Sequence, residues 1–371
     1  MKYGLIGCAL FVVSSVAASP RWPDAINSIA IGSCAKEREP QPIWETIGRA
    51  SPDLFLFIGD NQYADVHVDQ WGQRISHPVR DPKRFTEAYQ TLASKPAFAD
   101  FRSQVPIMAT WDDHDYGMND GGKEYPLKSL SQQAFLDFFG FADNDPIRKQ
   151  AGIYHSRVFG EPGKRVQVIM LDTRYHRDPL LRKENSNEEG LGPYKPTSDA
   201  TLTLLGETQW QWLEEQLLKP AEIRLLISSI QVVAHEHGWE TWGNMPHERE
   251  RLYQLISSTN ASGVVIISGD RHLTEVSVDK GQLGDKPPYP LWDFTVSGMT
   301  DAYKPVDELN SFRVSSVHRQ SHFGKLDIAW QEPLENTRIT LRALDAKGAN
   351  LYEQEVLLGQ LRHQTMSVGA E

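Results

Sequence analysis

The chain has 371 residues, 40% of them hydrophobic and 10% aromatic, so it is long enough to bury one large core or two ordinary ones. This composition excludes an intrinsically disordered chain, which would contain few aromatic residues. The formal net charge of −11 argues against duplex nucleic acid as a partner, because such a protein needs a basic face to neutralise phosphates.

The first residues of the chain resemble an export signal. Lys2 precedes an apolar stretch over residues 4–16 that is too short to span a membrane, and small residues follow it. We therefore expect a signal peptide over residues 1–19, a periplasmic or secreted location, and a single domain over residues 20–371. A buried N-terminal strand or anchor is the alternative. No later segment approaches the roughly 18 apolar residues of a membrane span, so stable membrane insertion is not expected.

Patterns typical of strands and helices alternate along most of the chain, which favours an α/β fold. We expect strands at 26–33, 53–58, 105–110, 165–171, 223–233 and 263–268, and helices at 40–48, 129–139, 207–218 and 247–256. Residues 175–203 are polar and lack a clear period, which predicts a long surface loop.

The last part of the chain is richer in strand patterns. Strands are expected at 292–297, 325–330, 337–343 and 350–357, and the turn residues at 345–348 join the last two as a C-terminal β-hairpin. Neither repeats nor a linker divide the sequence, so one domain with two sheets is the most economical interpretation.

Acidic, phenolic and imidazole side chains stand where two of these strands are expected to end. Asp60 and Tyr63 follow one strand, and Asp270 and His272 follow another. Because ligands bind at the carboxyl ends of strands in open α/β sheets, these side chains are candidates for a shared metal site. Asp270 and His272 are two positions apart, so both would face one side if the strand continues. A turn-forming role for Asp60 and a structural role for His272 are the alternatives.

A third strand is followed by Trp111, Asp112, Asp113, His114 and Asp115. Three neighbouring carboxylates repel one another unless cations or strong hydrogen bonds offset their charge. A solvated turn is the alternative, although the adjacent tryptophan makes free solvation less favourable. The three clusters together favour a metal-dependent hydrolase.

Three further residues carry side chains that bind metals. Cys34 is the only thiol left once a signal peptide is removed, and it stands at the end of the first expected strand. It is either a ligand or a small buried side chain. His235 and His237 are further candidate ligands, with a solvated loop as the alternative.

These motifs, in this order, resemble the alkaline phosphatase D (PhoD-like) family of the calcineurin-like metallophosphoesterases. The residues that carry the resemblance are Gly32-Ser33-Cys34, Gly59-Asp60 with Tyr63, Trp111 to Asp115, Leu171-Asp172-Thr173-Arg174, Gly206 with Gln209, Trp212 and Leu213, and Gly269-Asp270-Arg271-His272. The resemblance implies a four-layer α/β/β/α sandwich of two mixed β-sheets with two metal ions at the strand ends.

The resemblance also implies a set of metal ligands. One ion would be Fe(3+), held by Cys34, Asp60, Tyr63 and His272, and Asp60 would bridge to a second ion, often Ca(2+). Asp113 and Asp270 would hold that second ion. One thiolate and one imidazole suit a transition metal, whereas carboxylates suit a hard cation, so the donor set agrees with two unlike metals.

For the reaction, the resemblance implies hydrolysis of small phosphomonoesters or phosphodiesters by a metal-bound hydroxide. His114 would contact the phosphate or protonate the leaving group, and Asp115 joins it as a catalytic candidate. Arg174 would clamp the phosphate, with a structural pair to Asp172 as the alternative. The competing hypothesis is a non-catalytic protein on the same fold that binds phosphate or a surface polymer.

Overall fold

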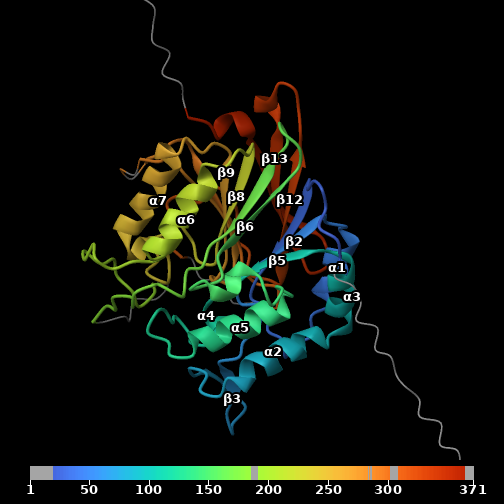
Figure 1. Ribbon diagram of the computed structural model, residues 1–371, viewed down its shortest axis with the longest axis vertical. Coiled ribbons are helices and arrows are strands. Elements are labelled where there is room, and N and C mark those ends of the chain that lie inside the picture. Colours follow the sequence, from blue (N-terminus) through green and yellow to red (C-terminus); the bar gives the residue numbers. More distant parts are fainter. Residues whose placement is uncertain (1–19, 185–190, 283, 285, 301–307, 364–371) are drawn as a thin grey trace, which may run out of the picture.

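The computed structural model describes residues 20–184, 191–282, 284, 286–300 and 308–363 (Figure 1). The predicted signal peptide at 1–19 lies outside the described residues. Within the described part of the chain, no helix is both long and apolar enough to cross a lipid bilayer.

Most strands of the described chain belong to two six-stranded mixed sheets. The first sheet has the order β14-β13-β12-β1-β2-β5, in which β1, β2 and β5 run parallel and the other neighbours are antiparallel. Its strands are β1 (Ser28–Gly32), β2 (Leu54–Ile58), β5 (Ile107–Thr110), β12 (His322–Ala329), β13 (Arg338–Asp345) and β14 (Asn350–Leu357). The predicted C-terminal β-hairpin is confirmed as β13–β14.

The second sheet has the order β10-β11-β9-β8-β7-β6, with parallel pairs from β7 to β11 and an antiparallel strand at each edge. Its strands are β6 (His155–Phe159), β7 (Val166–Met170), β8 (Ile223–Ser228), β9 (Val264–Ser268), β10 (Thr274–Asp279) and β11 (Leu291–Val296). A small separate hairpin joins β3 (Val66–Val68) to β4 (Arg74–Ser76).

Helices lie on different sides of the two sheets. In Figure 1, α6 and α7 lie beside β8 and β9, whereas α1 and α3 lie near β2. The α-helices are α1 (Ile43–Arg49), α2 (Lys83–Ala93), α3 (Pro96–Gln104), α4 (Asp113–Tyr116), α5 (Lys128–Phe138), α6 (Glu207–Leu217) and α7 (Pro246–Ser258). Short 3-10 helices span Pro146–Lys149, Trp242–Asn244, Leu334–Asn336 and Leu358–Gln360.

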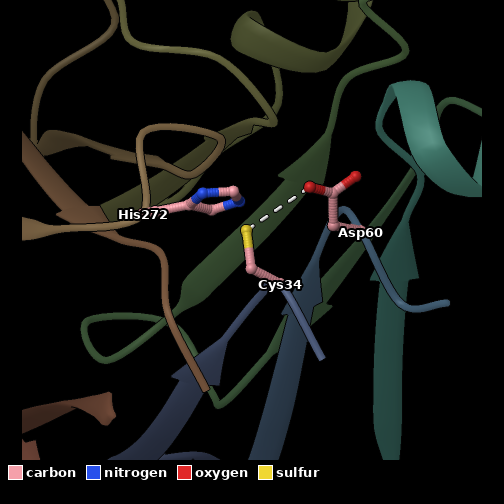
Figure 2. Close-up of side chains that lie close together, drawn as sticks. All are labelled: Cys34, Asp60 and His272. Carbon is pink, nitrogen blue, oxygen red and sulfur yellow. Dashed lines mark hydrogen bonds between the residues drawn. The ribbon is translucent and has the colours of Figure 1, made fainter. Parts of the chain in front are cut away.

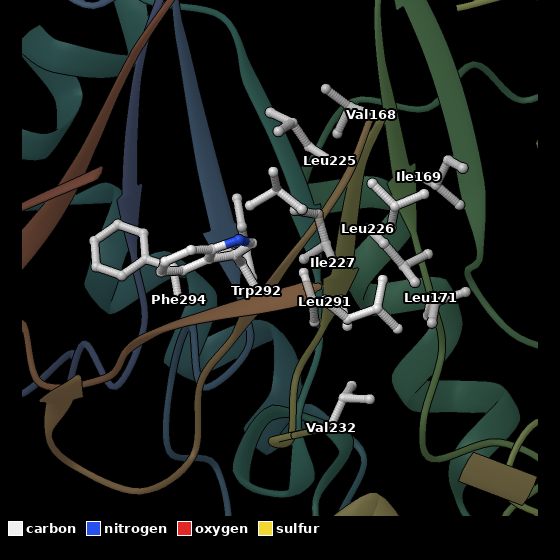
Figure 3. Close-up of a cluster of buried hydrophobic side chains, with 14 of the residues drawn as sticks. Val168, Ile169, Leu171, Leu225, Leu226, Ile227, Val232, Leu291, Trp292 and Phe294 are labelled. Atoms are coloured by element: carbon white, nitrogen blue, oxygen red, sulfur yellow. The ribbon is translucent and has the colours of Figure 1, made fainter. Parts of the chain in front are cut away.

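The alternation of side chains along β2 explains how the first sheet is packed. Leu54, Leu56 and Ile58 belong to the same hydrophobic cluster as the strands of the second sheet, part of which is drawn in Figure 3. Phe55 and Phe57 point the other way, because successive side chains of a strand face opposite sides. They pack edge-on against Trp44 of α1, with ring centroids 5.2 and 5.7 Å away. Each fully buried side chain of this size contributes about 1.5–3 kcal/mol.

Two sequence expectations need correction. The strand expected at 223–233 ends at Ser228, because the next residues leave the sheet and the amides of Val232 and Val233 bind the carboxylate of Asp293 at 2.9 and 3.0 Å. The polar segment 175–203 is not wholly at the surface in its described part, where Arg177 and Tyr194 are buried. The sequence patterns also missed the edge strands β6 and β10.

Candidate metal centre

The carboxyl ends of the parallel strands bring the predicted residues to one place. Cys34 follows β1, Asp60 follows β2, Asp113 begins α4 just after β5, and Asp270 and His272 follow β9. The two sheets touch at these ends, since Ser33 Oγ, just after β1, donates to the carbonyl of Val296 in β11 at 2.8 Å. A Cβ atom on Gly59 would lie 2.7 Å from that of Asp112, so only glycine fits between the ends of β2 and β5.

Four of these residues have a left-handed backbone. The φ angles are 56° at Cys34, 50° at Asp60, 68° at Asp270 and 51° at His272. Such angles are uncommon outside glycine and gather at functional sites, where the surrounding structure holds them. The strand β9 ends at Ser268 as expected, so the condition under which Asp270 and His272 would face the same side is not met. The chain turns sharply after Ser268 instead, and the turn aims each side chain separately.

The first group of candidate ligands comprises Cys34, Asp60 and His272 (Figure 2). One ligand atom from each lies within 4.8 Å of the others, and Cys34 Sγ is 3.4 Å from Asp60 Oδ2. Tyr63 Oη lies 3.2 Å from Asp60 Oδ2 and 3.4 Å from His272 Nε2. The structure thus brings together all the residues expected to hold the first metal.

The second group comprises Asp60, Asp113 and His114, whose ligand atoms meet the same 4.8 Å limit. Asp60 belongs to both groups and is buried, with 1% of its surface exposed. A carboxylate has two oxygens, so Asp60 is placed to serve two adjacent cations.

A third group links Asp113 to Asp120 and Glu240, two residues that the sequence patterns did not single out. Asp120 lies a few residues after α4, and its amide donates to Asp113 Oδ2 at 2.8 Å. Glu240 lies in an aperiodic loop segment between β8 and α7. No pattern in the sequence marks Glu240, because its position depends on the path of that loop.

Two residues expected to be catalytic, Asp115 and Arg174, are buried and hydrogen-bonded to other residues of the site. Asp115 is buried and accepts hydrogen bonds from the amide of Asp112 at 2.6 Å and from Asn61 Nδ2 at 2.5 Å. The Arg174 side chain has 0% exposure and donates to Asp112 and Glu240 at 2.7 and 2.8 Å. The suggested pairing of the Arg174 side chain with Asp172 is wrong, because the only Arg174 group that donates to the Asp172 carboxylate among the described contacts is the backbone amide.

Asp270 and the two loop histidines also differ from the first group. Asp270 lies outside the three groups, and its Oδ2 is 3.5 Å from Arg271 Nη1. His237 is buried rather than solvated, with its Nδ1 accepting from the Trp239 amide and its Nε2 directed at Gln231. His235 Nδ1 bonds the carbonyl of Val233 at 2.9 Å. These contacts do not favour His237 as a ligand.

Electrostatics at the centre are dominated by burial and by the close carboxylates. Burial, together with Asp113, raises the pKa of Asp60 well above its usual value. Burial works against the ionised form of Asp113 too, but His114 and Arg174 outweigh it and lower the pKa of Asp113 to about 2. Burial and the charge of Lys36 lower the pKa of His272, which keeps its ring neutral, as a metal ligand must be.

His114 differs from His272 in its surroundings. Burial disfavours its protonated form, but the carboxylates of Asp113, Asp65 and Asp60 outweigh burial and raise the pKa of His114 well above its usual value. Its Nδ1 lies 2.8 Å from Asp65 Oδ1, a residue that the sequence analysis missed. The surroundings of His114 therefore favour its protonated form.

The donor atoms fit a pair of cations. Within the described residues, Asp112 Oδ2, Asp113 Oδ1, Asp270 Oδ2 and the amide oxygen Asn61 Oδ1 are buried without a hydrogen-bond partner. Such buried acceptors are costly unless a donor or a cation satisfies them. The thiol, phenol and imidazole of the first group suit a transition metal, and the oxygen-rich second group suits a harder ion.

The comparisons with known proteins agree with this geometry. Alkaline phosphatase D of Bacillus subtilis (strain 168) is 26% identical over 286 residues, which cover 67% of this chain and 46% of that protein. The chain therefore spans less than half the length of that curated relative.

Two solved structures share the fold. One, described as the structure of PhoD, has a TM-score of 0.67 at 19% identity and covers 94% of this chain and 74% of its own. The purple acid phosphatase PPD1 from yellow lupin (Lupinus luteus) seeds has a TM-score of 0.54 at 14% identity, covering 92% and 55%. Both likenesses show a mixed α/β fold of the metallophosphoesterase type.

The model of one family, the PhoD-like phosphatases, matches residues 29–339, from β1 to β13. The match contains the three candidate ligand groups and most of both sheets. The chain belongs to the PhoD-like phosphatase family.

Proposed function

We propose that the protein is an exported, metal-dependent phosphohydrolase that cleaves phosphomonoesters, phosphodiesters or both. The observation that carries the proposal is the position of Asp60 in two ligand groups at once. A shared carboxylate sets two cations side by side, the arrangement used for in-line displacement at phosphorus. Membership of the PhoD-like family supports the same reaction class.

The residues would divide between two unlike metals. Cys34, Tyr63 and His272 would hold Fe(3+) together with Asp60, and Asp113 would hold Ca(2+) on the other side of Asp60. Asp270, whose buried Oδ2 has no hydrogen-bond partner among the described residues, would complete the second site. When bound, the two ions would activate water and stabilise charge on the phosphate oxygens.

His114 would protonate the leaving oxygen. Its Nδ1 is directed at Asp65, so Nε2 is the nitrogen left for the substrate, and it has no hydrogen-bond partner among the described residues. Arg174 and Asp115 would act as positioning residues rather than on the phosphate itself. Arg174 orients Asp112, and Asp115 caps the turn that carries Asp113 and His114.

The two sheets and their flanking helices support a helix–sheet–sheet–helix order of four layers, which we propose for this chain. Small phosphate esters are the proposed substrates, and a Sec-type signal peptide at 1–19 is the proposed route of export.

The experiment that tests the proposal compares the wild type with Asp60→Asn and with Asp100→Asn, a matched change at an exposed position of α3. Metal content is measured by elemental analysis, and turnover is measured with an aryl phosphodiester and an aryl phosphomonoester. We expect about two metals per chain in the wild type and in Asp100→Asn.

In Asp60→Asn we expect loss of metal and a drop in turnover of roughly 10³-fold or more, since the metals supply several kcal/mol of stabilisation to the transition state. Unchanged turnover in that variant would contradict the mechanism. Metal and phosphate binding without turnover on either ester would favour the non-catalytic binding protein.

A further inference from the structure

The side chain of Lys36 lies beside the first ligand group of the metal centre. Lys36 follows Cys34 by two residues and is half-buried. Its ammonium nitrogen Nζ lies 5.4 Å from the centroid of the Tyr63 ring. The hydroxyl of that ring is 3.2 Å from Asp60 Oδ2 and 3.4 Å from His272 Nε2. A positive charge is therefore close to the three side chains that converge in Figure 2.

The main chain at Lys36 is held on both sides. Its amide donates to Thr300 Oγ1 at 2.9 Å, and Thr300 Oγ1 donates to the carbonyl of Cys34, also at 2.9 Å. The carbonyl of Lys36 accepts the amide of Glu39 at 3.0 Å and Nε2 of Gln41 at 2.9 Å. These bonds fix the Cα atom of Lys36 relative to the candidate ligand Cys34. The lysine stem has four carbons and several rotamers, so the ammonium group can adjust to a ligand from this fixed base.

The guanidinium groups at the centre are less able to meet a ligand. Arg174 is fully buried and pairs with Asp112 and Glu240. The side chain of Arg271 is 13% exposed and pairs with Glu308 at 2.7 Å. Moving either guanidinium away from its carboxylates would leave a buried charge unpaired, which is strongly unfavourable. A cation on a more flexible side chain is therefore better suited to contact an anion that enters the centre.

The charge of Lys36 acts inside the centre. After burial, it is the largest cause that lowers the pKa of His272. The centre also contains the acidic side chains of Asp60, Asp113 and Asp270, and the whole chain has a net charge of −11, so its surroundings disfavour an anion unless cations are present. Lys36 would add to the attraction that bound metal ions exert on a phosphate group.

We propose that the ammonium group of Lys36 binds an oxygen of the substrate phosphate at the metal centre. The inference rests on the proposed function and assigns to Lys36 the contact with phosphate that the buried Arg174 does not make. An ammonium group is a compact charge with three N–H donors, and lysine commonly binds phosphate in this way. His114 also packs against Tyr63, so Lys36 and the proposed proton donor lie around the same ring. Lys36 would hold the phosphate while His114 protonates the leaving oxygen.

Calorimetry with inorganic phosphate tests this contact directly. The metal-loaded wild type is compared with Lys36→Met, which keeps most of the stem and removes the charge, and with Lys36→Arg, which keeps the charge. Lys36→Met should weaken phosphate binding about tenfold, the loss expected for one hydrogen bond to a charged group. Lys36→Arg should recover most of the affinity. Lys164→Met is the matched control and should bind phosphate like the wild type, because Lys164 is exposed in the turn before β7, at the opposite edge of the second sheet.

Steady-state kinetics and metal content show how Lys36 acts. With an aryl phosphodiester, Lys36→Met should raise KM by a similar factor and leave kcat within about threefold, because the contact is already made in the bound substrate. Elemental analysis should give about two metals per chain in all four proteins. Loss of metal from Lys36→Met would mean that Lys36 supports the ligands instead, and it would overturn the proposal. Unchanged phosphate affinity in metal-loaded Lys36→Met would overturn it as well.

The same measurements separate this inference from the proposed function. Phosphate binding requires no turnover, so it can be measured even if no ester is cleaved. Binding that depends on Lys36, without turnover of any ester, would support the contact and reject the proposed hydrolysis. Turnover with a phosphate affinity and a KM that do not depend on Lys36 would leave the function standing and reject the contact. Absence of phosphate binding to the metal-loaded wild type would also reject the contact.

Discussion

His114 and Asp65 form a pair at the edge of the metal centre, with Nδ1 of the imidazole 2.8 Å from Oδ1 of the carboxylate. The imidazole also packs against the ring of Tyr63, with a centroid distance of 4.1 Å and an angle of 30° between the ring planes. The hydrogen bond and the ring contact together fix the orientation of the His114 ring. In the proposed reaction, a proton donor held in this way would need no reorientation when the substrate binds.

Removing the Asp65 carboxylate should therefore slow the reaction without emptying the metal sites. We expect Asp65→Asn to lower kcat by about 10- to 100-fold, the usual effect of losing a residue that orients a functional side chain. KM and metal content should change little. Ser76→Ala removes the other side-chain partner of Asp65 and serves as the control. Loss of metal from Asp65→Asn would show that Asp65 supports the ligands instead.

The two ligand groups should lose their metals separately. Cys34→Ser removes a donor found only in the first group, and Asp113→Asn removes a charge from the second. Each variant should retain about one metal per chain, and the iron should be missing only from Cys34→Ser. Elemental analysis after gel filtration measures both contents. Loss of both metals from either variant would mean that the two sites fill together.

The buried ion pairs of Arg174 predict a large effect on stability. Arg174→Met leaves Asp112 and Glu240 buried without the guanidinium that pairs with both. Breaking a buried ion pair on one side costs about 3–5 kcal/mol. The free energy of unfolding, measured with urea, should fall by this amount. A fall below about 1 kcal/mol would show that water or metal replaces the guanidinium.

His322 predicts a dependence of stability on pH. It is fully buried, and burial lowers the pKa of His322 to about 4, against 6.5 for an exposed histidine. Its Nε2 accepts the amide of Ser297 and its Nδ1 bonds the carbonyl of Gln320, so the folded state holds the neutral ring.

Below pH 6.5 the unfolded chain binds a proton at this residue that the folded chain does not. The contribution is thus fully present above pH 6.5 and is lost as the pH falls toward 4, by roughly 1.4 kcal/mol per pH unit. His322→Asn should flatten the slope of unfolding free energy against pH in this window. Equal slopes for the variant and the wild type would refute the assignment.

The strand ends of the metal centre could be predicted from the sequence because they depend on local rules. A run such as Leu54 to Ile58 must be a buried strand, and the residues after it must lie at the carboxyl edge of a sheet. That reasoning correctly gathered Cys34, Asp60 and His272.

Residues whose position depends on the path of a loop could not be predicted. Glu240 lies near Asp113 in the loop after β8, and Asp293 of β11 binds the start of this loop through the amide of Val232. Asp65 and Asp120 are likewise placed by turns rather than by a periodic element. The same reason explains why the buried partners of Arg174 and Asp115 could not be foreseen, although the basic and acidic character of these residues was visible in the sequence.

Cys34, Asp60, Asp270 and His272 have a left-handed backbone. The site requires this conformation, but it lowers the thermal stability of the protein. Each of these residues costs roughly 1 kcal/mol relative to glycine, which adopts the same angles freely. Replacing Cys34 or His272 by glycine would relieve that local strain while destroying the site. Among metal-free proteins, the inactive glycine variants should therefore melt at higher temperatures than the alanine variants at the same positions. Selection for the reaction would then keep the stability of this protein below the stability that glycine at these positions would allow.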